Sequence, residues 1–277
     1  MEFAIQIGDV FVKVGARIRD FQIDFEVIPE YFRTLVETLQ IKRVKDYRLA
    51  RAGDDHDGGY ILIDNLDSQG GIAYSFGIER EISWDHDMAE CGYQIFMYDM
   101  TIDDLPYHRP EFHFFQEGIG RELDLSQRLD TLENFIERNG HQNQRNMILK
   151  MDVEGAEWDF LETVKSETLM KFDQIIFEFH NLVTDMDFER IGRRIAALRK
   201  LNQTHQVVHI HANNNCPAVI YEDDFYGDVI EVTYANRANY EFEDAEIILP
   251  NPTVDAPNIP EYPEIELGNW NARFKNS

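Results

Sequence analysis

Short apolar segments alternate with longer amphipathic segments through the middle of the chain. The strand-like segments are residues 72–76, 94–98, 112–115, 147–151, 174–179 and 206–210, and the helical ones are roughly 80–91, 126–139, 157–171 and 186–202. In the last helical segment, apolar side chains recur every three or four residues while arginines occupy the opposite side. This alternation predicts βαβ units, and therefore a parallel sheet covered by helices.

Different patterns flank this repeat. Residues 28–41 have the spacing of a helix, and residues 47–50 and 60–64 resemble two strands around a glycine-rich turn. After Cys216, strand-like segments at 218–221, 229–234 and 245–249 are separated only by short loops, which predicts an antiparallel edge. We therefore expect a lead-in of residues 1–47, a main α/β domain of residues 48–250, and a proline-rich acidic tail of residues 251–277 that docks on the surface.

Composition narrows the classes of protein. The 277 residues include 26 Lys and Arg against 52 Asp and Glu, and the net charge of −26 disfavours binding to nucleic acid or to anionic membranes. Two distant cysteines, Cys91 and Cys216, suggest neither a disulfide framework nor a zinc site. The start of the chain is acidic and charges interrupt every apolar run, so we expect a cytoplasmic protein without membrane insertion.

The first two strands carry candidate binding residues at their carboxyl ends, where ligands bind in sheets of this type. Gly77 follows the first strand, and a glycine there permits close approach of a ligand, although a plain strand-to-helix turn explains it equally well. Asp99 ends the second strand about twenty residues later, at the spacing of an acid that binds a ribose. Alone, it would be a turn or cap residue. The glycine fingerprints of NAD(P) and ATP sites are absent from the sequence.

The later strands end in carboxylates and histidines. Asp152 and Glu154 follow the fourth strand, and Glu178 and His180 share one face at the end of the fifth. A lone histidine is usually structural, but an imidazole beside a carboxylate at a ligand-binding edge is a candidate general base. His211, on the sixth strand, is the second candidate base.

Several of these motifs occur together in a characteristic order. They are Ser75-Phe76-Gly77-Ile78-Glu79 with Ser83-Trp84-Asp85, Tyr98-Asp99-Met100-Thr101, Lys150-Met151-Asp152-Val153-Glu154-Gly155-Ala156-Glu157, and Glu178-Phe179-His180. The ordered set resembles the FkbM-type S-adenosylmethionine-dependent methyltransferases, especially the branch close to sugar and polysaccharide O-methyltransferases. Asp57-Gly58-Gly59-Tyr60 and His211-Ala212-Asn213-Asn214 resemble motifs of the same branch.

The resemblance implies a Rossmann-like class I methyltransferase fold, with a mostly parallel seven-stranded sheet and an antiparallel strand near the C-terminal end. It also implies S-adenosylmethionine as the cofactor. Residues matching the family's cofactor site are Ser75, Phe76 and Gly77 at the methionine part, Ser83 at its carboxylate, Asp99 at the ribose, Met100, Gly118 and Ile119 near the adenine, and Asp57 at the edge of the pocket. Glu79 departs from the pattern, because many class I enzymes have a further glycine there.

The expected reaction is O-methylation of a sugar hydroxyl, on a free sugar or a nucleotide sugar, in surface polysaccharide or glycoconjugate biosynthesis. His180, steered by Asp152 or Glu178, is the expected base, and the expected route uses no metal. Two alternatives remain: a Mg²⁺-dependent small-molecule O-methyltransferase that uses the same carboxylates, and a non-catalytic nucleoside-binding module. The lead-in and the tail are the candidate contacts of a homodimer.

Overall fold

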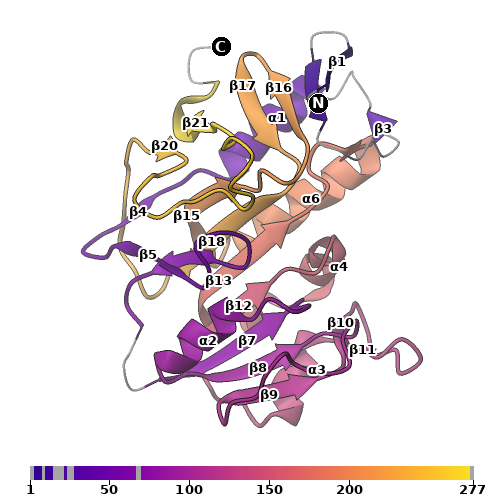
Figure 1. Cartoon of the computed structure of the whole chain (residues 1–277), viewed down its shortest axis with the longest axis vertical. Coiled ribbons are helices and arrows are strands. Elements are labelled where there is room, and N and C mark those ends of the chain that lie inside the picture. Colours follow the sequence, from indigo (N-terminus) through magenta and orange to yellow (C-terminus); the bar gives the residue numbers. More distant parts are fainter. Residues whose placement is uncertain (1–2, 8–9, 15–21, 24–27, 67–69, 275–277) are drawn as a thin grey trace.

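The computed structural model describes residues 3–7, 10–14, 22–23, 28–66 and 70–274, and a seven-stranded sheet is its centre (Figure 1). The strands follow the spatial order β15 (His205–Ala212), β18 (Ile230–Asn236), β13 (Phe172–Phe179), β12 (Met147–Met151), β7 (Ile72–Phe76), β8 (Gln94–Tyr98) and β9 (Phe112–Phe115). Strands β9, β8, β7, β12 and β13 are parallel to one another. Strand β18 runs antiparallel between β13 and β15. The predicted α/β fold, with its antiparallel strand near the C-terminal end, is confirmed.

The predicted helices are present, but two have different bounds. The segment 126–139 becomes helical only at α3 (Leu132–Arg138), because residues before it form the short parallel strands β10 (Gly118–Ile119) and β11 (Leu129–Asp130). The segment 157–171 is split into α4 (Ala156–Thr163) and α5 (Ser166–Leu169), since Val164 and Lys165 adopt extended backbone angles between them. The other helices are α1 (Ile28–Thr38), α2 (Ser83–Glu90) and α6 (Phe188–Leu201).

Two apolar cores lie on the two faces of the sheet. One joins α1, α3, α4 and α6 to the side chains of alternate strand residues such as Phe76 and Phe177. The other joins α2 and the hairpin of β5 (Leu49–Ala52) and β6 (Tyr60–Ile63) to the intervening residues, such as Ile95 and Ile176. Because both faces are covered, the sheet's carboxyl edge remains the place where polar side chains from several strands meet.

Small elements surround this frame. β1 (Phe3–Ile7), β2 (Val10–Val14), β16 (Ala218–Tyr221) and β17 (Asp224–Gly227) form a second sheet. Pairs of two-residue strands are β3 (Gln22–Ile23) with β14 (Asp185–Met186), β4 (Arg43–Val44) with β19 (Phe242–Glu243), and β20 (Ile248–Leu249) with β21 (Gly268–Asn269), which precedes the 3-10 turn η1 (Trp270–Ala272). Of the three strands expected after Cys216, only β18 therefore enters the main sheet.

The proline-rich segment after residue 250 packs closely against the rest of the chain. The amide of Asn214 donates to the carbonyls of Ile259 and Tyr262, each at 3.0 Å, and Trp270 is buried. Met1 and Glu2 of the expected lead-in, and residues 275–277 of the expected tail, lie outside the described residues. A search of the described helices finds none with the length and apolar character needed to span a membrane.

Candidate active site

Strand register brings the predicted site residues into one row along the carboxyl edge of the sheet. Met151 lies beside both Phe76 and Phe177, and Phe76 lies beside Tyr98. The residues one step further along these strands, Gly77, Asp99, Asp152 and Glu178, are therefore neighbours. Backbone hydrogen bonds continue the pairing, from Asp152 N to Phe76 O at 3.0 Å and from Gly77 N to Tyr98 O at 3.1 Å.

A cavity of about 360 Å³ opens along this row. Ten predicted site residues line it, namely Asp57, Phe76, Gly77, Asp99, Met100, Gly118, Ile119, Asp152, Glu178 and His180. Within the described chain, three further candidates, Ser75, Ser83 and His211, are not part of the lining. Tyr60, Lys150 and Asn213, which the sequence analysis quoted only within longer motifs, also line the cavity.

Gly77 packs very closely against the neighbouring strand end at Asp152. Its φ is +71°, and a Cβ atom there would lie 1.5 Å from the carbonyl oxygen of Asp152. Any larger residue would push the first and fourth strand ends apart. The Gly77 carbonyl accepts a hydrogen bond of 3.0 Å from Nζ of Lys150, so a buried cation also fixes the turn.

Asp99 holds the same turn from the other side. Its Oδ2 accepts from the backbone N–H groups of Ile78 and Glu79 at 2.9 and 2.7 Å, and its Oδ1 accepts from the backbone N–H and the hydroxyl of Thr101 at 2.7 and 2.6 Å. Burial alone would raise the pKa of Asp99, but these hydrogen bonds lower it overall. The carboxylate is thus ionised, and a ligand hydroxyl binding to it would share or replace these donors.

The cavity wall beside Asp99 is apolar. Phe76, Met100, Ile119 and Leu129 line it, and the rings of Phe76 and Tyr98 stack with centroids 4.9 Å apart. A flat apolar pocket next to an ionised acid suits a nucleoside, whose base is hydrophobic and whose ribose donates hydrogen bonds. The residues present therefore fit the adenosyl part of the cofactor that the sequence predicts.

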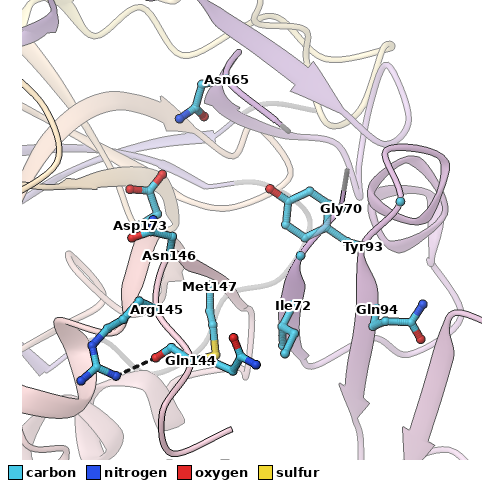
Figure 2. A pocket seen from close by; sticks show the side chains of 12 residues that line it. Asn65, Gly70, Ile72, Tyr93, Gln94, Gln144, Arg145, Asn146, Met147 and Asp173 are labelled. Carbon is cyan, nitrogen blue, oxygen red and sulfur yellow. Dashed lines mark hydrogen bonds between the residues drawn. The ribbon is translucent and has the colours of Figure 1, made fainter. Parts of the chain in front are cut away.

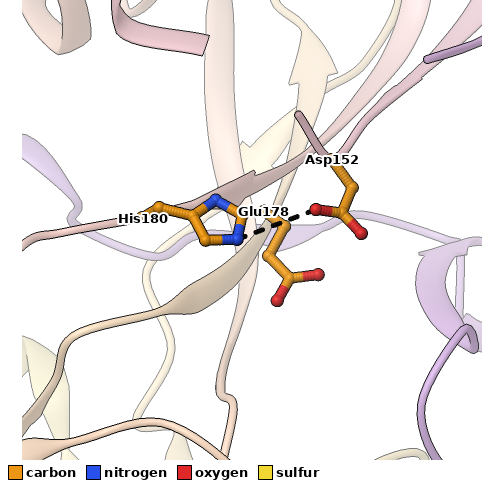
Figure 3. A group of neighbouring side chains, drawn as sticks. All are labelled: Asp152, Glu178 and His180. Carbon is orange, nitrogen blue, oxygen red and sulfur yellow. Dashed lines mark ion pairs between the residues drawn. The ribbon is translucent and has the colours of Figure 1, made fainter. Parts of the chain in front are cut away.

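The opposite end of the cavity holds Asp152, Glu178 and His180 (Figure 3). Nε2 of His180 lies 3.7 Å from Oδ1 of Asp152 and 3.8 Å from Oε2 of Glu154, and its Nδ1 lies 3.4 Å from Oε1 of Glu157. Asn213 donates to Oε1 of Glu178 at 3.0 Å. Two carboxylates and an imidazole thus converge on one point at this end of the cavity.

The acidic surroundings control the charge of this cluster. Burial alone would lower the pKa of His180, but Glu157, Glu178 and Asp152 together raise it to about 10. Burial and repulsion by Asp152 and Glu231 raise the pKa of Glu178 well above its usual range. At neutral pH, the raised pKa values of His180 and Glu178 favour the protonated form of each group.

Two of the three candidates outside the cavity have other partners, and the third is buried away from it. The Ser83 hydroxyl accepts a hydrogen bond of 2.8 Å from the backbone N–H of Asp54, in the loop that also carries Asp57. Ser75 is fully buried beneath the turn. The ring of His211 lies between Glu231 and Glu264, with nitrogen to oxygen distances of 3.3 and 3.2 Å, and these acids raise its pKa to about 10 despite burial.

A second cavity, of about 560 Å³, lies at the opposite edge of the sheet (Figure 2). Gly71, Tyr93, Met147 and Asp173 line it at the beginnings of the strands. The carboxylate of Asp173 already accepts hydrogen bonds from Asn239 and Tyr240. None of the predicted site residues borders this cavity in the described chain, so the candidate site is the smaller one.

The sheet order, the inserted antiparallel strand and the cavity at the carboxyl edge define a Rossmann-like methyltransferase fold. The sequence pattern of the family described as "Methyltransferase FkbM domain" matches residues 10–204, and the chain belongs to that family. It is accordingly a methyltransferase by family. None of the curated proteins matches the chain significantly.

Solved structures resemble the chain only at the level of the fold. A fibrillarin/Nop5p complex aligns with TM-score 0.38 and 10% identity over 84% of this chain and 97% of that one. A variant of the 16S rRNA (adenine(1408)-N(1))-methyltransferase from Catenulisporales acidiphilia aligns with TM-score 0.29 and 9% identity over 70% and 100%. A putative hemolysin from Streptococcus thermophilus aligns with TM-score 0.37 and 9% identity over 65% and 72%.

Proposed function

We propose that this chain transfers the methyl group of S-adenosylmethionine to a hydroxyl group of a sugar, in the synthesis of a surface polysaccharide or glycoconjugate. The observation that carries the proposal is the single cavity whose one end suits a nucleoside and whose other end gathers Asp152, Glu178 and His180. A methyl donor and a proton acceptor are the two requirements of O-methylation.

The cofactor end is formed by residues already in place. Asp99 would accept the ribose hydroxyls, Met100 and Ile119 would contact the adenine, and Gly77 would let the backbone approach the methionine part. When bound, S-adenosylmethionine supplies an electrophilic methyl group on a sulfonium. The task of the protein is to align the acceptor oxygen with that group and to remove its proton.

The charge of the lining favours a neutral acceptor. Seven lining residues are acidic, namely Asp57, Glu79, Glu81, Asp99, Asp152, Glu154 and Glu178. The only lysine among the lining residues, Lys150, is buried and donates to the Gly77 carbonyl. An anionic nucleotide sugar would be repelled here unless a cation accompanied it, so a neutral sugar chain is the better acceptor.

The proton of the acceptor hydroxyl is taken within the cluster. Because His180 is itself protonated at neutral pH, the carboxylate of Asp152 is the group that accepts the proton. Asp152 is partly open to the cavity, and Nε2 of His180 lies 3.7 Å from its Oδ1, where a protonated ring stabilises the charge of the carboxylate. In this proposal His180 is a positioning residue, in place of the base that the sequence predicts.

The test is transfer of a labelled methyl group from S-adenosylmethionine to neutral oligosaccharides, with nucleotide sugars as a parallel set. We expect Asp152→Asn and His180→Gln to lower the transfer rate by about 10²-fold while leaving affinity for S-adenosylhomocysteine nearly unchanged. Glu264→Gln is the matched control, because it removes a carboxylate beside a histidine outside the cavity.

Two results would contradict the proposal. Near-normal transfer by both Asp152→Asn and His180→Gln would remove the cluster from the reaction. Binding of S-adenosylhomocysteine without transfer to any acceptor would favour the alternative of a non-catalytic nucleoside-binding module.

A further inference from the structure

We propose that Asp152, Glu178 and His180 form a binding site for one divalent cation such as Mn²⁺ or Mg²⁺. Each of the three offers one ligand atom, and these atoms all lie within 4.8 Å of one another (Figure 3). The inference rests on the function proposed above and assigns a further ligand to the same site.

The set of donors suits such an ion. Carboxylate oxygens are the preferred ligands of Mg²⁺ and Mn²⁺, and an imidazole nitrogen extends the preference to Mn²⁺ and its neighbours in the first transition row. Glu178 and His180 are buried, whereas Asp152 is partly open to the cavity. An ion held here would therefore keep a side facing the acceptor.

The hydroxyl of Tyr60 lies between the two carboxylates of the cluster. It lies 3.0 Å from Oδ2 of Asp152 and 3.1 Å from Oε2 of Glu178. A phenol hydroxyl has a single proton, so Tyr60 can donate to only one of these two carboxylates at a time. The other carboxylate oxygen remains without a donor from Tyr60, beside a like charge.

His180 supplies an independent observation. The residue is 8% exposed, yet its buried Nδ1 has no hydrogen-bond partner among the described residues. Nε2 points toward Asp152, but its distances of 3.7 and 3.8 Å to Asp152 and Glu154 are too long for hydrogen bonds. A buried imidazole whose Nε2 faces two acids without bonding to them is placed as a ligand would be, and an ion bound at Nε2 would take the place of the proton there.

Neighbouring groups hold the three ligands in position. Glu157 accepts from the backbone N–H of His180 at 2.7 Å, and Trp158 donates to the His180 carbonyl at 2.9 Å. Asn213 fixes Glu178 from the far side. Supports of this kind orient the ligands of metal sites before the ion arrives.

A cation would change how the cluster acts. It would neutralise the acids, bind the oxygen of the acceptor hydroxyl and lower that hydroxyl's pKa. The O–H bond of the acceptor would then break with release of its proton to solvent, because the ion would occupy Asp152. A C–O bond would form as the C–S bond of S-adenosylmethionine breaks, and S-adenosylhomocysteine would leave. An ion with open positions also favours acceptors with two adjacent oxygens, such as the vicinal hydroxyls of a sugar.

The experiment is titration of the full chain, first freed of metal with EDTA and then dialysed, with Mn²⁺. Binding is followed by loss of the electron paramagnetic resonance signal of free Mn²⁺. We expect one Mn²⁺ per chain, displaced by excess Mg²⁺, and an affinity at least about tenfold weaker in Asp152→Asn and in Glu178→Gln. Glu264→Gln should bind Mn²⁺ like the unaltered protein, because its carboxylate lies beside His211 outside the cavity.

Absence of saturable Mn²⁺ binding would overturn the inference, as would equal binding by Asp152→Asn, Glu178→Gln and Glu264→Gln. Binding of S-adenosylhomocysteine to the same EDTA-treated samples separates this result from the proposed function. Cofactor binding without Mn²⁺ binding removes only the metal site, whereas Mn²⁺ binding without cofactor binding removes the proposed reaction.

Discussion

The contact between Gly77 and Asp152 yields a quantitative prediction for the Gly77→Ala variant. The new Cβ would begin 1.5 Å from the Asp152 carbonyl oxygen, whereas real Cβ atoms stay beyond 3.0 Å, so the two strand ends must separate. Three hydrogen bonds meet at this point: Gly77 N to Tyr98 O, Asp152 N to Phe76 O, and Lys150 Nζ to Gly77 O. Losing them costs about 3 kcal/mol, at roughly 1 kcal/mol each.

Backbone strain adds to this loss. A residue with a Cβ in the left-handed region costs about 1 kcal/mol more than glycine, so the free energy of unfolding should fall by about 4 kcal/mol in total. Gly140→Ala is the matched control, because Gly140 has a similar φ of +78° but meets nothing within 4 Å. It should lose only about 1 kcal/mol, from strain alone.

Equilibrium denaturation in urea, followed by tryptophan fluorescence, measures both variants. The reasoning predicts a clear gap between Gly77→Ala and Gly140→Ala, together with lost binding of S-adenosylhomocysteine in Gly77→Ala alone. Equal destabilisation of the two variants would refute the claim that strand ends at this edge are closely packed.

Two further predictions concern His205, on the edge strand β15, and the C-terminal segment. Burial lowers the pKa of His205 to about 4, so the unfolded chain binds the extra proton between pH 6.5 and 4. The stability contributed by neutral His205 is therefore full above pH 6.5 and falls by about 3 kcal/mol toward pH 4. The free energy of unfolding of His205→Gln, measured at both pH values, should lack this loss. An equal loss in His205→Gln and the unaltered protein would contradict the prediction. Asn214→Ala removes hydrogen bonds to the carbonyls of Ile259 and Tyr262, so limited proteolysis should cleave the chain beyond residue 250 faster. An unchanged cleavage rate would contradict the claim that these bonds hold the C-terminal segment against the rest of the chain.

Much of the fold was predictable because its signals are local. The alternation of apolar and amphipathic segments predicted the parallel strands β7, β8, β9, β12 and β13 of the main sheet, and the changed rhythm after Cys216 predicted an antiparallel strand. The partners of short strands were not predictable, since β16 and β20 carry no signal that assigns them to one sheet over another. The break between α4 and α5 is set by two extended residues and leaves little trace in the periodicity.

The candidate site was predictable where it follows strand ends. Asp99, Asp152 and Glu178 line the cavity because register aligns the last residues of neighbouring strands. Tyr60 was missed as a member of the cluster, because its hydroxyl arrives from a separate hairpin more than 90 residues from Asp152. The alternation of side chains along a strand places His209 and His211 on one face of β15. It cannot show that Glu231 and Glu264 lie on either side of the His211 ring.

The protonation state of His180 also could not be predicted from the sequence. Its charge depends on Glu157, Glu178 and Asp152 together, and the sequence does not show that Glu157, in the first turn of α4, lies against the ring of His180. Only the assembled site shows that the acids around this histidine outnumber the cations. That imbalance underlies the assignment of the base to Asp152.

The most direct test of the central claim is calorimetric titration of the full chain with S-adenosylhomocysteine in the presence of EDTA. Asp99→Asn is compared with Asp103→Asn, an exposed acid of the same loop. The account predicts micromolar binding that weakens at least about tenfold in Asp99→Asn and is unchanged in Asp103→Asn. No binding by the unaltered protein, or equal binding by both variants, would contradict the placement of the cofactor at Asp99.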